Sequence, residues 1–454
     1  MNLNFLFFIF LIYVINISCI YTFKLKKHSN YLNFNLKSNN NHKSEISATE
    51  NKENSIILKS NKDNLYYFDI EIGTPGQIIS VLIDTGSNYF WINNGKCVGC
   101  NSQKKFDKDK SNTFNNVNEQ IKINYLSGNL SGIISTDIIK FTNNKNISDF
   151  NFILINESNI NFELDGIFGL SKNPKDINKS KYSPLNQIYK NNNFNNYIFT
   201  LDFPNKRSYI GDIPSYLNLY QNISCKRKSI FNLTEYYWKC VSKKIKIENS
   251  FNTNNINDFI HKVNNIIFDS GINSVVFSYN YIPLFKNIIS NNELLTNSKC
   301  QIKSSEENSN IFFIFCEDIN NLMNKENKLY KKLFKDDFIS ISLDNIKEKI
   351  SLNFENLFDK NFKSFKLYFI DHIPDDTIIL GIPFFERYIV SFNKDTDEII
   401  IYNTKEENLY IESFNIKWIL IICIGIIIIL IALIIYYIYY QKNRISLYKL
   451  IYQK

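Results

Sequence analysis

The sequence lacks the residue clusters that zinc, nucleotide and serine-hydrolase sites need. Its 4 histidines are scattered without His-x-x-x-His spacing, and the Cys-x-x-Cys motif at Cys97–Cys100 has no second copy. A zinc site needs four ligands, so no zinc centre is expected. No Gly-x-Ser-x-Gly motif and no phosphate-cradling glycine loop is present. We therefore expect an activity that needs no metal and no cofactor.

Concentrated positive charge is missing too. The net charge of +8 is spread along the chain, without a dense block of lysine and arginine or an interleaved aromatic platform. Proteins that bind nucleic acids gather basic residues on one face or along one helix. No nucleic-acid partner is therefore expected. Glycine is scarce, at 13 residues. The asparagine runs indicate surface loops that are rich in asparagine rather than a functional low-complexity segment.

Long apolar runs occur near the two ends of the chain. Residues 4–15 have the length of a secretory signal core, which predicts a signal peptide over residues 1–19. Trp418–Tyr440 contains no charged residue. As a helix, a run of this length reaches about 35 Å, enough to cross a bilayer. More basic residues follow this run than precede it, which predicts a single-pass type I membrane protein with a lumenal or extracellular body.

The sequence pattern between these runs predicts an all-β fold. Short alternating stretches from Leu65 onward are separated by glycine, asparagine and proline. Helices are few; the clearest is Ser183–Tyr189, with Pro184 in its first turn. Residues 20–63 are polar and free of glycine, and fit either a linker or an inhibitory pro-segment whose lysines cover the site. Surface loops are expected at 142–151, 173–182, 249–265 and 303–310.

Six cysteines lie in the predicted lumenal part, and an even number in an oxidising compartment favours three disulfides. Six cysteines allow fifteen connectivities. Proximity along the chain favours the pairs Cys97–Cys100, Cys225–Cys240 and Cys300–Cys316. Outside the predicted signal peptide, six Asn-x-Ser/Thr sequons add the expectation of a glycoprotein. They begin at Asn129, Asn146, Asn156, Asn178, Asn222 and Asn232.

Two apolar stretches end in an aspartate followed by a small hydroxyl residue and a glycine. One is Val81–Ser87 and the other is Ile266–Gly271, about one domain length further along the chain. A buried strand that stops in this way places a carboxylate at the strand end. If Asp84 and Asp269 face each other, both cannot ionise, so the pair holds one proton and offers one acid and one base to a shared water.

Further motifs follow in an order that is similar to the pepsin-type aspartic endopeptidases, a family that includes cathepsin D, renin, β-secretase and the plasmepsins. The resemblance covers roughly Leu65 to Asn403. The motifs are the entry strand Tyr66–Gln77, the first catalytic loop Asp84–Trp91, the flap hairpin Asn124–Gly128 and two glycine-bearing strands, Asp165–Leu170 and Ile379–Phe385.

The resemblance implies a bilobal, all-β fold in which Asp84 and Asp269 activate water against a peptide carbonyl across a deep cleft. Thr85 and Ser270 would hydrogen-bond the facing loop, and Ser87 would donate to Asp84. Gly86, Gly271 and Gly128 belong to the same loops and to the flap. The Tyr125 hydroxyl would meet the Trp91 indole and close the flap over a polypeptide substrate.

Two positions depart from the family pattern. Ile272 stands where the second loop usually has a hydroxyl residue, and Ile382 stands where pepsin has an aspartate. Removing a donor to an ionised carboxylate raises its pKa, so a working pH milder than that of a digestive enzyme is expected. Ile272 also leaves open a catalytically inactive, membrane-held peptide-binding protein. A structural or adhesive surface protein on the same scaffold is the other alternative.

We therefore expect a monomeric, membrane-anchored endopeptidase that acts on polypeptides. The predicted parts are a signal peptide (1–19), a pro-segment or linker (20–63), an N-terminal lobe (64–213), a C-terminal lobe (214–404), a juxtamembrane segment (405–417), a transmembrane helix (418–440) and a cytosolic tail (441–454).

Overall fold

The structure is a computed structural model that describes residues 55–407 with short gaps, together with residue 424 and residues 428–442. All of these residues belong to the second of two compact units, residues 51–454. The predicted signal peptide and most of the 20–63 segment lie outside the described residues. The gaps are at 126, 143–144, 174–176, 191–195, 227–235, 248–258, 262–263, 307, 325, 327–329, 331–336 and 344–345.

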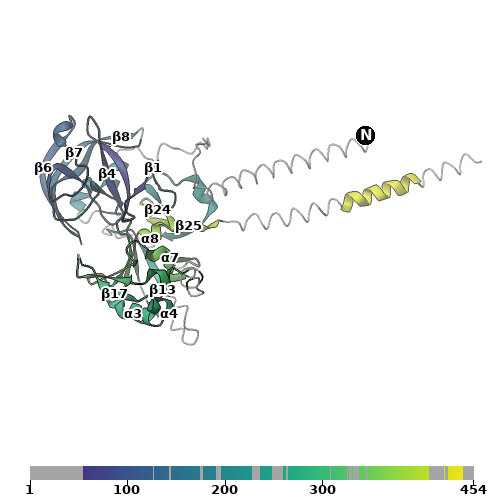
Figure 1. The fold of residues 1–454 in the computed structure, drawn as a ribbon. Helices are drawn as coiled ribbons and strands as arrows, with labels where there is room; N and C mark the ends of the chain where they lie inside the picture. The colour runs from purple at the N-terminus through teal and green to yellow at the C-terminus, as the bar shows by residue number, and fades with distance from the viewer. Residues whose placement is uncertain are drawn as a thin grey trace, which may run out of the picture. The chain divides into compact units, whose positions relative to one another are not determined.

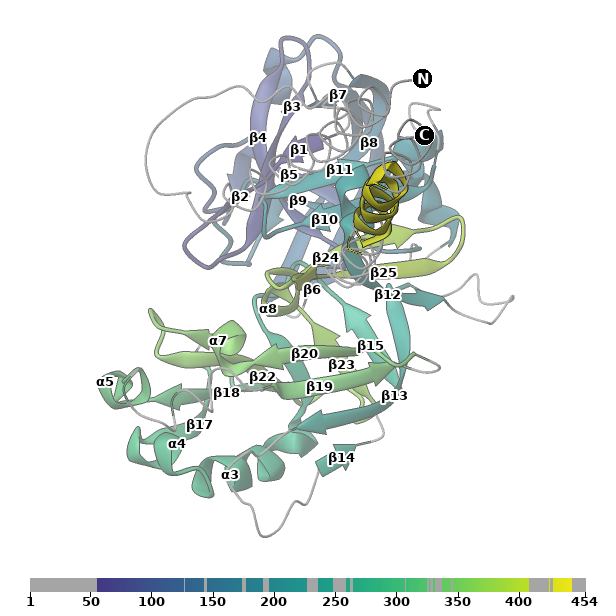
Figure 2. The ribbon, with the colours of Figure 1, turned by 90° about the vertical axis from the view of Figure 1, so that its right-hand side faces the viewer.

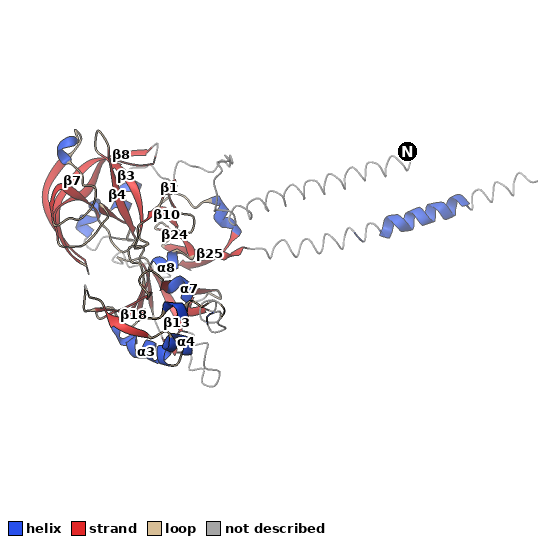
Figure 3. Ribbon diagram, viewed as in Figure 1, coloured by secondary structure: helices blue, strands red, loops and turns tan. Residues whose placement is uncertain are grey.

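Strands are the main element of the described chain, which confirms the predicted all-β class (Figure 3). The first half forms an eight-stranded sheet, coloured purple to blue in Figure 1. Alternation drives its formation, because every second side chain of Tyr66–Ile72 is buried. In spatial order the strands are β2 (Lys59–Ser60), β3 (Tyr66–Ile72), β4 (Gln77–Asp84), β9 (Gly166–Gly169), β5 (Phe90–Val98), β8 (Lys145–Ser158), β7 (Gly128–Thr142) and β6 (Asn115–Tyr125).

The second half forms an eleven-stranded sheet, coloured mainly green in Figure 1. Two of its strands, β14 (Phe259–His261) and β21 (Phe358–Asp359), pair beside the main path, with β13 and β22 respectively. The main path runs β17 (Cys300–Ser304), β18 (Ile311–Cys316), β22 (Ser364–Ile370), β16 (Val275–Ser278), β23 (Thr377–Leu380), β15 (Asn265–Phe268), β13 (Lys239–Ile247), β19 (Asp337–Leu343) and β20 (Lys349–Asn353).

The centres of the two sheets repeat one pattern. In the first, β4 pairs parallel with β9, β9 antiparallel with β5, and β5 parallel with β8. In the second, β15 pairs parallel with β23, β23 antiparallel with β16, and β16 parallel with β22. The strands that lead to the two aspartates, β4 and β15, therefore occupy equivalent places in the two sheets.

A third sheet of six strands takes members from both halves. Strand β10 pairs with β24, so a segment near residue 200 joins one near residue 390 (Figure 2). The predicted lobe boundary at residue 213 falls inside the segment that supplies this shared sheet. In order, the strands are β1 (Ser55–Ile57), β11 (Arg207–Ile210), β10 (Ile198–Asp202), β24 (Tyr388–Asn393), β25 (Glu398–Glu407) and β12 (Tyr220–Lys226).

Two local expectations were wrong. Strands β1 and β2 lie before residue 64, where the N-terminal lobe was expected to start, because Ile56 and Leu58 are buried within a stretch dominated by polar residues. Most of the expected loop at 142–151 belongs to β7 and β8. Ile147 and Phe150 are buried there, and the surrounding asparagines and lysine hid the strand pattern.

The expected helix at Ser183–Tyr189 is confirmed as α2 (Pro184–Lys190). More helices are present than the sequence suggested, although most are only one turn long. The longest between residues 55 and 407 is α3 (Ile282–Ser290), which buries Ile282, Phe285 and Ile288 at helical spacing. The others are α4 (Glu293–Asn297), α5 (Ile319–Leu322), α7 (Phe354–Leu357), α8 (Ile382–Phe385) and the 3-10 turns η2 (Lys108–Lys110), η3 (Ile177–Tyr182), η4 (Ser215–Leu219) and η5 (Tyr279–Tyr281).

The predicted transmembrane segment, residues 418–440, lies partly outside the described residues. Residues 424 and 428–442 are helical. Among the residues that the structure describes, none belongs to a helix with both the length and the apolar character needed to cross a membrane.

Candidate active site

Each aspartate of the two motifs stands at the end of a buried central strand. Asp84 is the last residue of β4, and its carbonyl accepts a hydrogen bond from the Leu170 amide at 2.6 Å. Asp269 follows β15, and its amide donates to the Leu380 carbonyl at 3.0 Å. Each aspartate is therefore held by a main-chain hydrogen bond to one of the two predicted glycine-bearing segments, Asp84 through its carbonyl and Asp269 through its amide.

The hydroxyl residues after the aspartates tie the two loops together. The Thr85 hydroxyl donates to the Phe268 carbonyl at 2.9 Å and accepts from the Ser270 amide at 2.9 Å. The Ser270 hydroxyl donates to the Ile83 carbonyl at 2.8 Å and accepts from the Thr85 amide at 3.0 Å. Both side chains are 0 % exposed. This reciprocal set of four bonds fixes one loop against the other.

The two carboxyl groups lie side by side. A Cβ added to Gly86 would lie 2.2 Å from Asp269 Oδ2, and one added to Gly271 would lie 2.5 Å from Asp84 Oδ1. Side-chain atoms essentially never come this close, so each loop needs glycine where it passes the opposite carboxyl group. The two carboxyl groups are also within hydrogen-bonding range of each other. Residues remote along the chain thus form one acidic pair.

The surroundings of the two carboxyl groups differ. Asp84 accepts from the Ser87 hydroxyl at 2.5 Å and from the Gly86 amide at 2.8 Å. Asp269 accepts from the Gly271 amide at 2.9 Å. Burial raises the pKa of Asp84, and the bonds from Ser87 and Gly86 oppose that rise. Burial, followed by the negative charge of Asp84, raises the pKa of Asp269 well above its usual value. A pair of this kind holds one proton between its two carboxyl groups, and the bonds from Ser87 and Gly86 favour the negative charge on Asp84.

The end of the β6–β7 hairpin carries the predicted flap residues Tyr125 and Gly128. The Trp91 indole N–H donates to the Tyr125 hydroxyl at 3.0 Å. Burial raises the pKa of Tyr125, and the negative charge of Asp84 raises it further, so this hydroxyl stays neutral near the acidic pair. Trp91 is 1 % exposed and its ring lies 5.8 Å from that of Phe162. The flap tyrosine is therefore held by a rigid aromatic partner.

Sequence reasoning missed three aromatic residues beside the pair. The Trp238 indole donates to the Leu170 carbonyl at 2.7 Å, and its own carbonyl accepts from the Phe268 amide at 3.0 Å. It therefore links the segments behind both aspartates. The Tyr236 hydroxyl donates to Asn88 at 3.2 Å. Burial, followed by the negative charges of Asp269 and Asp84, raises the pKa of Tyr237. The unusual run of three aromatics at 236–238 was the only signal in the sequence.

The two departures from the family pattern are neighbours in the fold. The Ile382 amide donates to the Ile272 carbonyl at 2.8 Å. Ile382 is fully buried, and Ile272 packs against an apolar cluster that includes Val276 and Ile379. Neither side chain can donate a hydrogen bond to Asp269, which agrees with the direction of its pKa.

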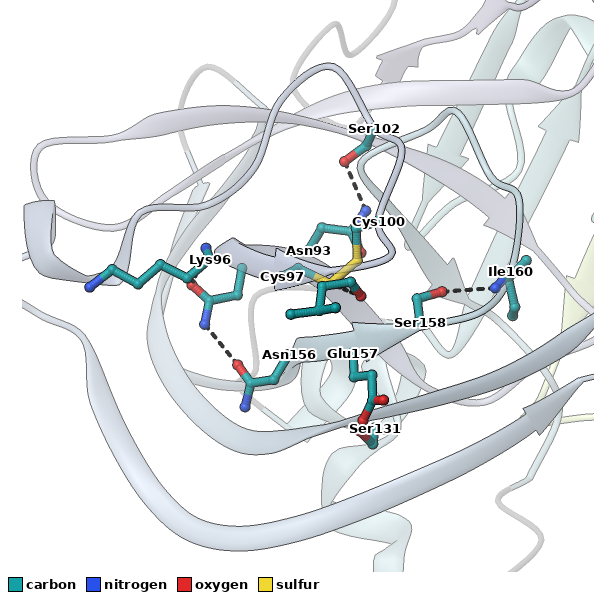
Figure 4. Close-up of a disulfide and its surroundings, with 12 residues drawn as sticks. Asn93, Lys96, Cys97, Cys100, Ser102, Ser131, Asn156, Glu157, Ser158 and Ile160 are labelled. Carbon is teal, nitrogen blue, oxygen red and sulfur yellow. Dashed lines mark hydrogen bonds between the residues drawn. A yellow bond between two sulfur atoms is a disulfide. The ribbon is translucent and has the colours of Figure 1, made fainter.

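The cysteines are joined in the three pairs that proximity favours: Cys97–Cys100, Cys225–Cys240 and Cys300–Cys316. The second pair links β12 of the shared sheet to β13 of the eleven-stranded sheet. The first closes the loop after β5 (Figure 4). Within the described residues, histidine, cysteine and acidic side chains nowhere gather in a group of three that could hold a metal ion.

Comparison with known proteins agrees with this geometry. Residues 65–403 match the family model described as eukaryotic aspartyl protease. Plasmepsin I of Plasmodium falciparum is 30% identical over 164 residues, which are 34% of this chain and 35% of that protein. Chymosin of Bos taurus is 34% identical over 122 residues, 26% of this chain and 32% of chymosin. Pepsin A of Gallus gallus is 38% identical over 96 residues, 21% of this chain and 25% of pepsin.

These alignments span about a third of the length of the first relatives or less. The family model, in contrast, covers most of the chain and includes both strand-end aspartates, the flap and both glycine-bearing strands. The chain belongs to the eukaryotic aspartyl protease family.

Proposed function

We propose that this chain is an aspartic endopeptidase that hydrolyses peptide bonds with Asp84, Asp269 and a water held between them. The observation that carries the proposal is the interlocking of the two loops, in which the glycine of each packs against the carboxyl group of the other. Family membership and the peptidase names of the relatives support it.

The different surroundings of the carboxyl groups assign their roles. Asp84, ionised and stabilised by Ser87, takes a proton from the water, and the oxygen of that water attacks the peptide carbonyl carbon. Asp269 gives its proton to the carbonyl oxygen, so a neutral tetrahedral diol forms without an acyl intermediate. The diol then collapses: Asp84 gives the proton it took from the water to the amide nitrogen, one diol hydroxyl returns its proton to Asp269, and the C–N bond breaks. A carboxylic acid and an amine leave, and both aspartates are back in their starting states.

Cleavage of a generic hydrophobic peptide tests this function. We expect cleavage that pepstatin inhibits and that Asp84→Ala abolishes, because the general base is then missing. The pH–rate profile is expected to peak above about pH 4, the usual pKa of an aspartate, because burial raises the pKa of both carboxyl groups. Peptide binding without turnover would instead support the inactive peptide-binding alternative, which Ile272 keeps open.

A membrane tether is the second part of the proposal. Trp418–Tyr440 contains no charged residue. In its described part the apolar side chains are exposed, with Ile428 at 61%, Leu433 at 57% and Ile435 at 62%. A run of exposed large apolar side chains is costly in water and favours a membrane or protein partner. The basic residues after residue 441 favour a cytosolic tail, and so a protease domain on the lumenal or outer side.

The tether predicts a preference for substrates in the same membrane. Confinement raises the effective concentration of such substrates relative to soluble ones. We expect a form truncated before residue 418 to cleave a soluble peptide as fast as the full chain does. It should cleave a membrane-anchored copy of the same peptide more slowly. Equal rates on the anchored copy would contradict the tether.

A further inference from the structure

At the end of the flap hairpin, strand β7 has a strand partner on one edge only. Strand β7 pairs with β6 up to Tyr125–Gly128, at the turn of the hairpin. On its other edge, β7 pairs with β8 only as far as Leu130–Ser158, where β8 ends. The main chain of residue 129 therefore extends one position beyond the end of β8. It lies next to the hairpin turn that connects Tyr125 to Gly128.

Asn159 fills this gap. Its amide donates to the Asn129 carbonyl at 3.2 Å, and its side-chain Oδ1 accepts from the Asn129 amide at 2.6 Å. The side-chain oxygen replaces the main-chain carbonyl that a longer β8 would have supplied. Gly128, at φ +141, packs so closely that an added Cβ would lie 2.4 Å from Asn159 Oδ1. The side chain is thus fitted to the turn of the flap.

The segment that carries Asn159 is itself held from behind. The Ser158 hydroxyl accepts from the Ile160 amide at 3.1 Å, which shapes the turn (Figure 4). Gly99, in the loop closed by the Cys97–Cys100 disulfide, packs so closely that an added Cβ would lie 2.0 Å from the Ser158 carbonyl. Ile160 is 7% exposed and belongs to the apolar cluster of Trp91. Asn159 therefore contacts the flap from a rigid support.

We propose that Asn159 is a positioning residue that latches the flap and so keeps Tyr125 over the acidic pair. The inference rests on the proposed peptidase function for its effect on catalysis, but not for its effect on the flap. The latch consists of two hydrogen bonds to one residue, and only one of them depends on the Asn159 side chain. A side-chain substitution can therefore weaken the latch without removing the main-chain bond.

Three variants separate the latch from general effects on the loop. Asn159→Ala removes the side-chain acceptor, and Asn159→Asp keeps an oxygen at the same place. Asn161→Ala is the matched control, because its Oδ1 accepts from Asn101 rather than from the flap, at 3.2 Å. A net contribution near 1 kcal/mol for one hydrogen bond corresponds to a change of about fivefold.

The first measurement is hydrogen exchange of the full-length chain in detergent, followed by mass spectrometry over a peptide that contains Asn129. We expect about fivefold faster exchange of this flap peptide in Asn159→Ala, and rates near those of the wild type in Asn159→Asp and Asn161→Ala. Unchanged exchange in Asn159→Ala would overturn the latch. Faster exchange throughout the molecule would mean that Asn159 acts on folding and would also overturn it.

The second measurement is peptide cleavage. We expect a fall in kcat/KM of about fivefold in Asn159→Ala and recovery in Asn159→Asp. Faster flap exchange with unchanged kcat/KM would overturn the positioning of Tyr125. If the wild type cleaves no peptide, the proposed function fails, while the exchange result still decides whether the latch exists.

Discussion

Asp269→Asn is expected to lower kcat for peptide cleavage by on the order of 10³- to 10⁴-fold while the chain stays folded. Asparagine has the shape of a protonated aspartate and can still accept from the Gly271 amide, which donates at 2.9 Å. It cannot transfer a proton to the carbonyl oxygen. The control is Asp109→Asn, because Asp109 is an exposed residue paired with Lys96 and Lys108. Equal activity of wild type and Asp269→Asn would contradict the assigned role.

The same variant should change how stability depends on pH. The pKa of Asp269 is raised in the folded protein, first by burial and then by Asp84. A carboxyl group of this kind favours the fold below its unfolded pKa, and that contribution is lost as pH rises through the folded pKa. Wild type should therefore lose stability above about pH 4, and Asp269→Asn should lose less. Urea unfolding at several pH values measures this, and equal pH dependence in both proteins would contradict it.

The sequence predicted the site better than it predicted the fold around it. The aspartate motifs depend on local rules: an apolar strand, a carboxylate at its end, and a glycine to turn the chain. Those rules operate within about six residues, so Val81–Ser87 and Ile266–Gly271 could be recognised without knowing what surrounds them. The contacts around Thr85 and Ser270 agree with what the family resemblance implied.

The shared six-stranded sheet could not be predicted in this way. Pairing between β10 and β24 joins residues almost 200 positions apart. A local sequence pattern can indicate a strand, but it does not indicate which other strand pairs with it. The sequence therefore predicts a lobe boundary at residue 213. In the structure, the strands on either side of this residue, β11 and β12, belong to one sheet with β24 and β25 from the end of the second half. Trp238 was missed for the same reason, because its role depends on contacts with Leu170 and Phe268.

Composition obscured other elements. In β8 the buried Ile147 and Phe150 lie three positions apart across a register shift, with the exposed Ser148 and Asp149 between them, so no strict alternation marks this strand in the sequence. Asn159 was hidden in a different way. In a chain with so many asparagines, nothing distinguishes one that replaces a main-chain carbonyl from one that faces solvent. The role of Asn159 becomes visible only in the structure, where β8 ends at Ser158 and the next residue bonds to the main chain of Asn129.

Thr85→Val is expected to lower the free energy of unfolding by about 2–6 kcal/mol, because it leaves two buried polar groups without partners. Valine keeps the branched shape of threonine. It can neither donate to the Phe268 carbonyl nor accept from the Ser270 amide, both of which bond the Thr85 hydroxyl at 2.9 Å. The site is 0 % exposed, so water cannot replace the missing group. A loss of this size approaches the whole stability of a typical domain.

Thr85→Ser is the matched control, because it keeps the hydroxyl and loses one methyl group, at a cost of about 1 kcal/mol. Urea unfolding of both variants separates hydrogen bonding from packing. Failure of Thr85→Val to fold, beside a folded Thr85→Ser, would be the upper end of the expected effect. Peptide cleavage should fall further in Thr85→Val than in Thr85→Ser, since the loops that align the carboxyl groups lose their contact. Equal stability of the two variants would show that the hydroxyl does not hold the loops together, and the account of how the acidic pair is aligned would then be wrong.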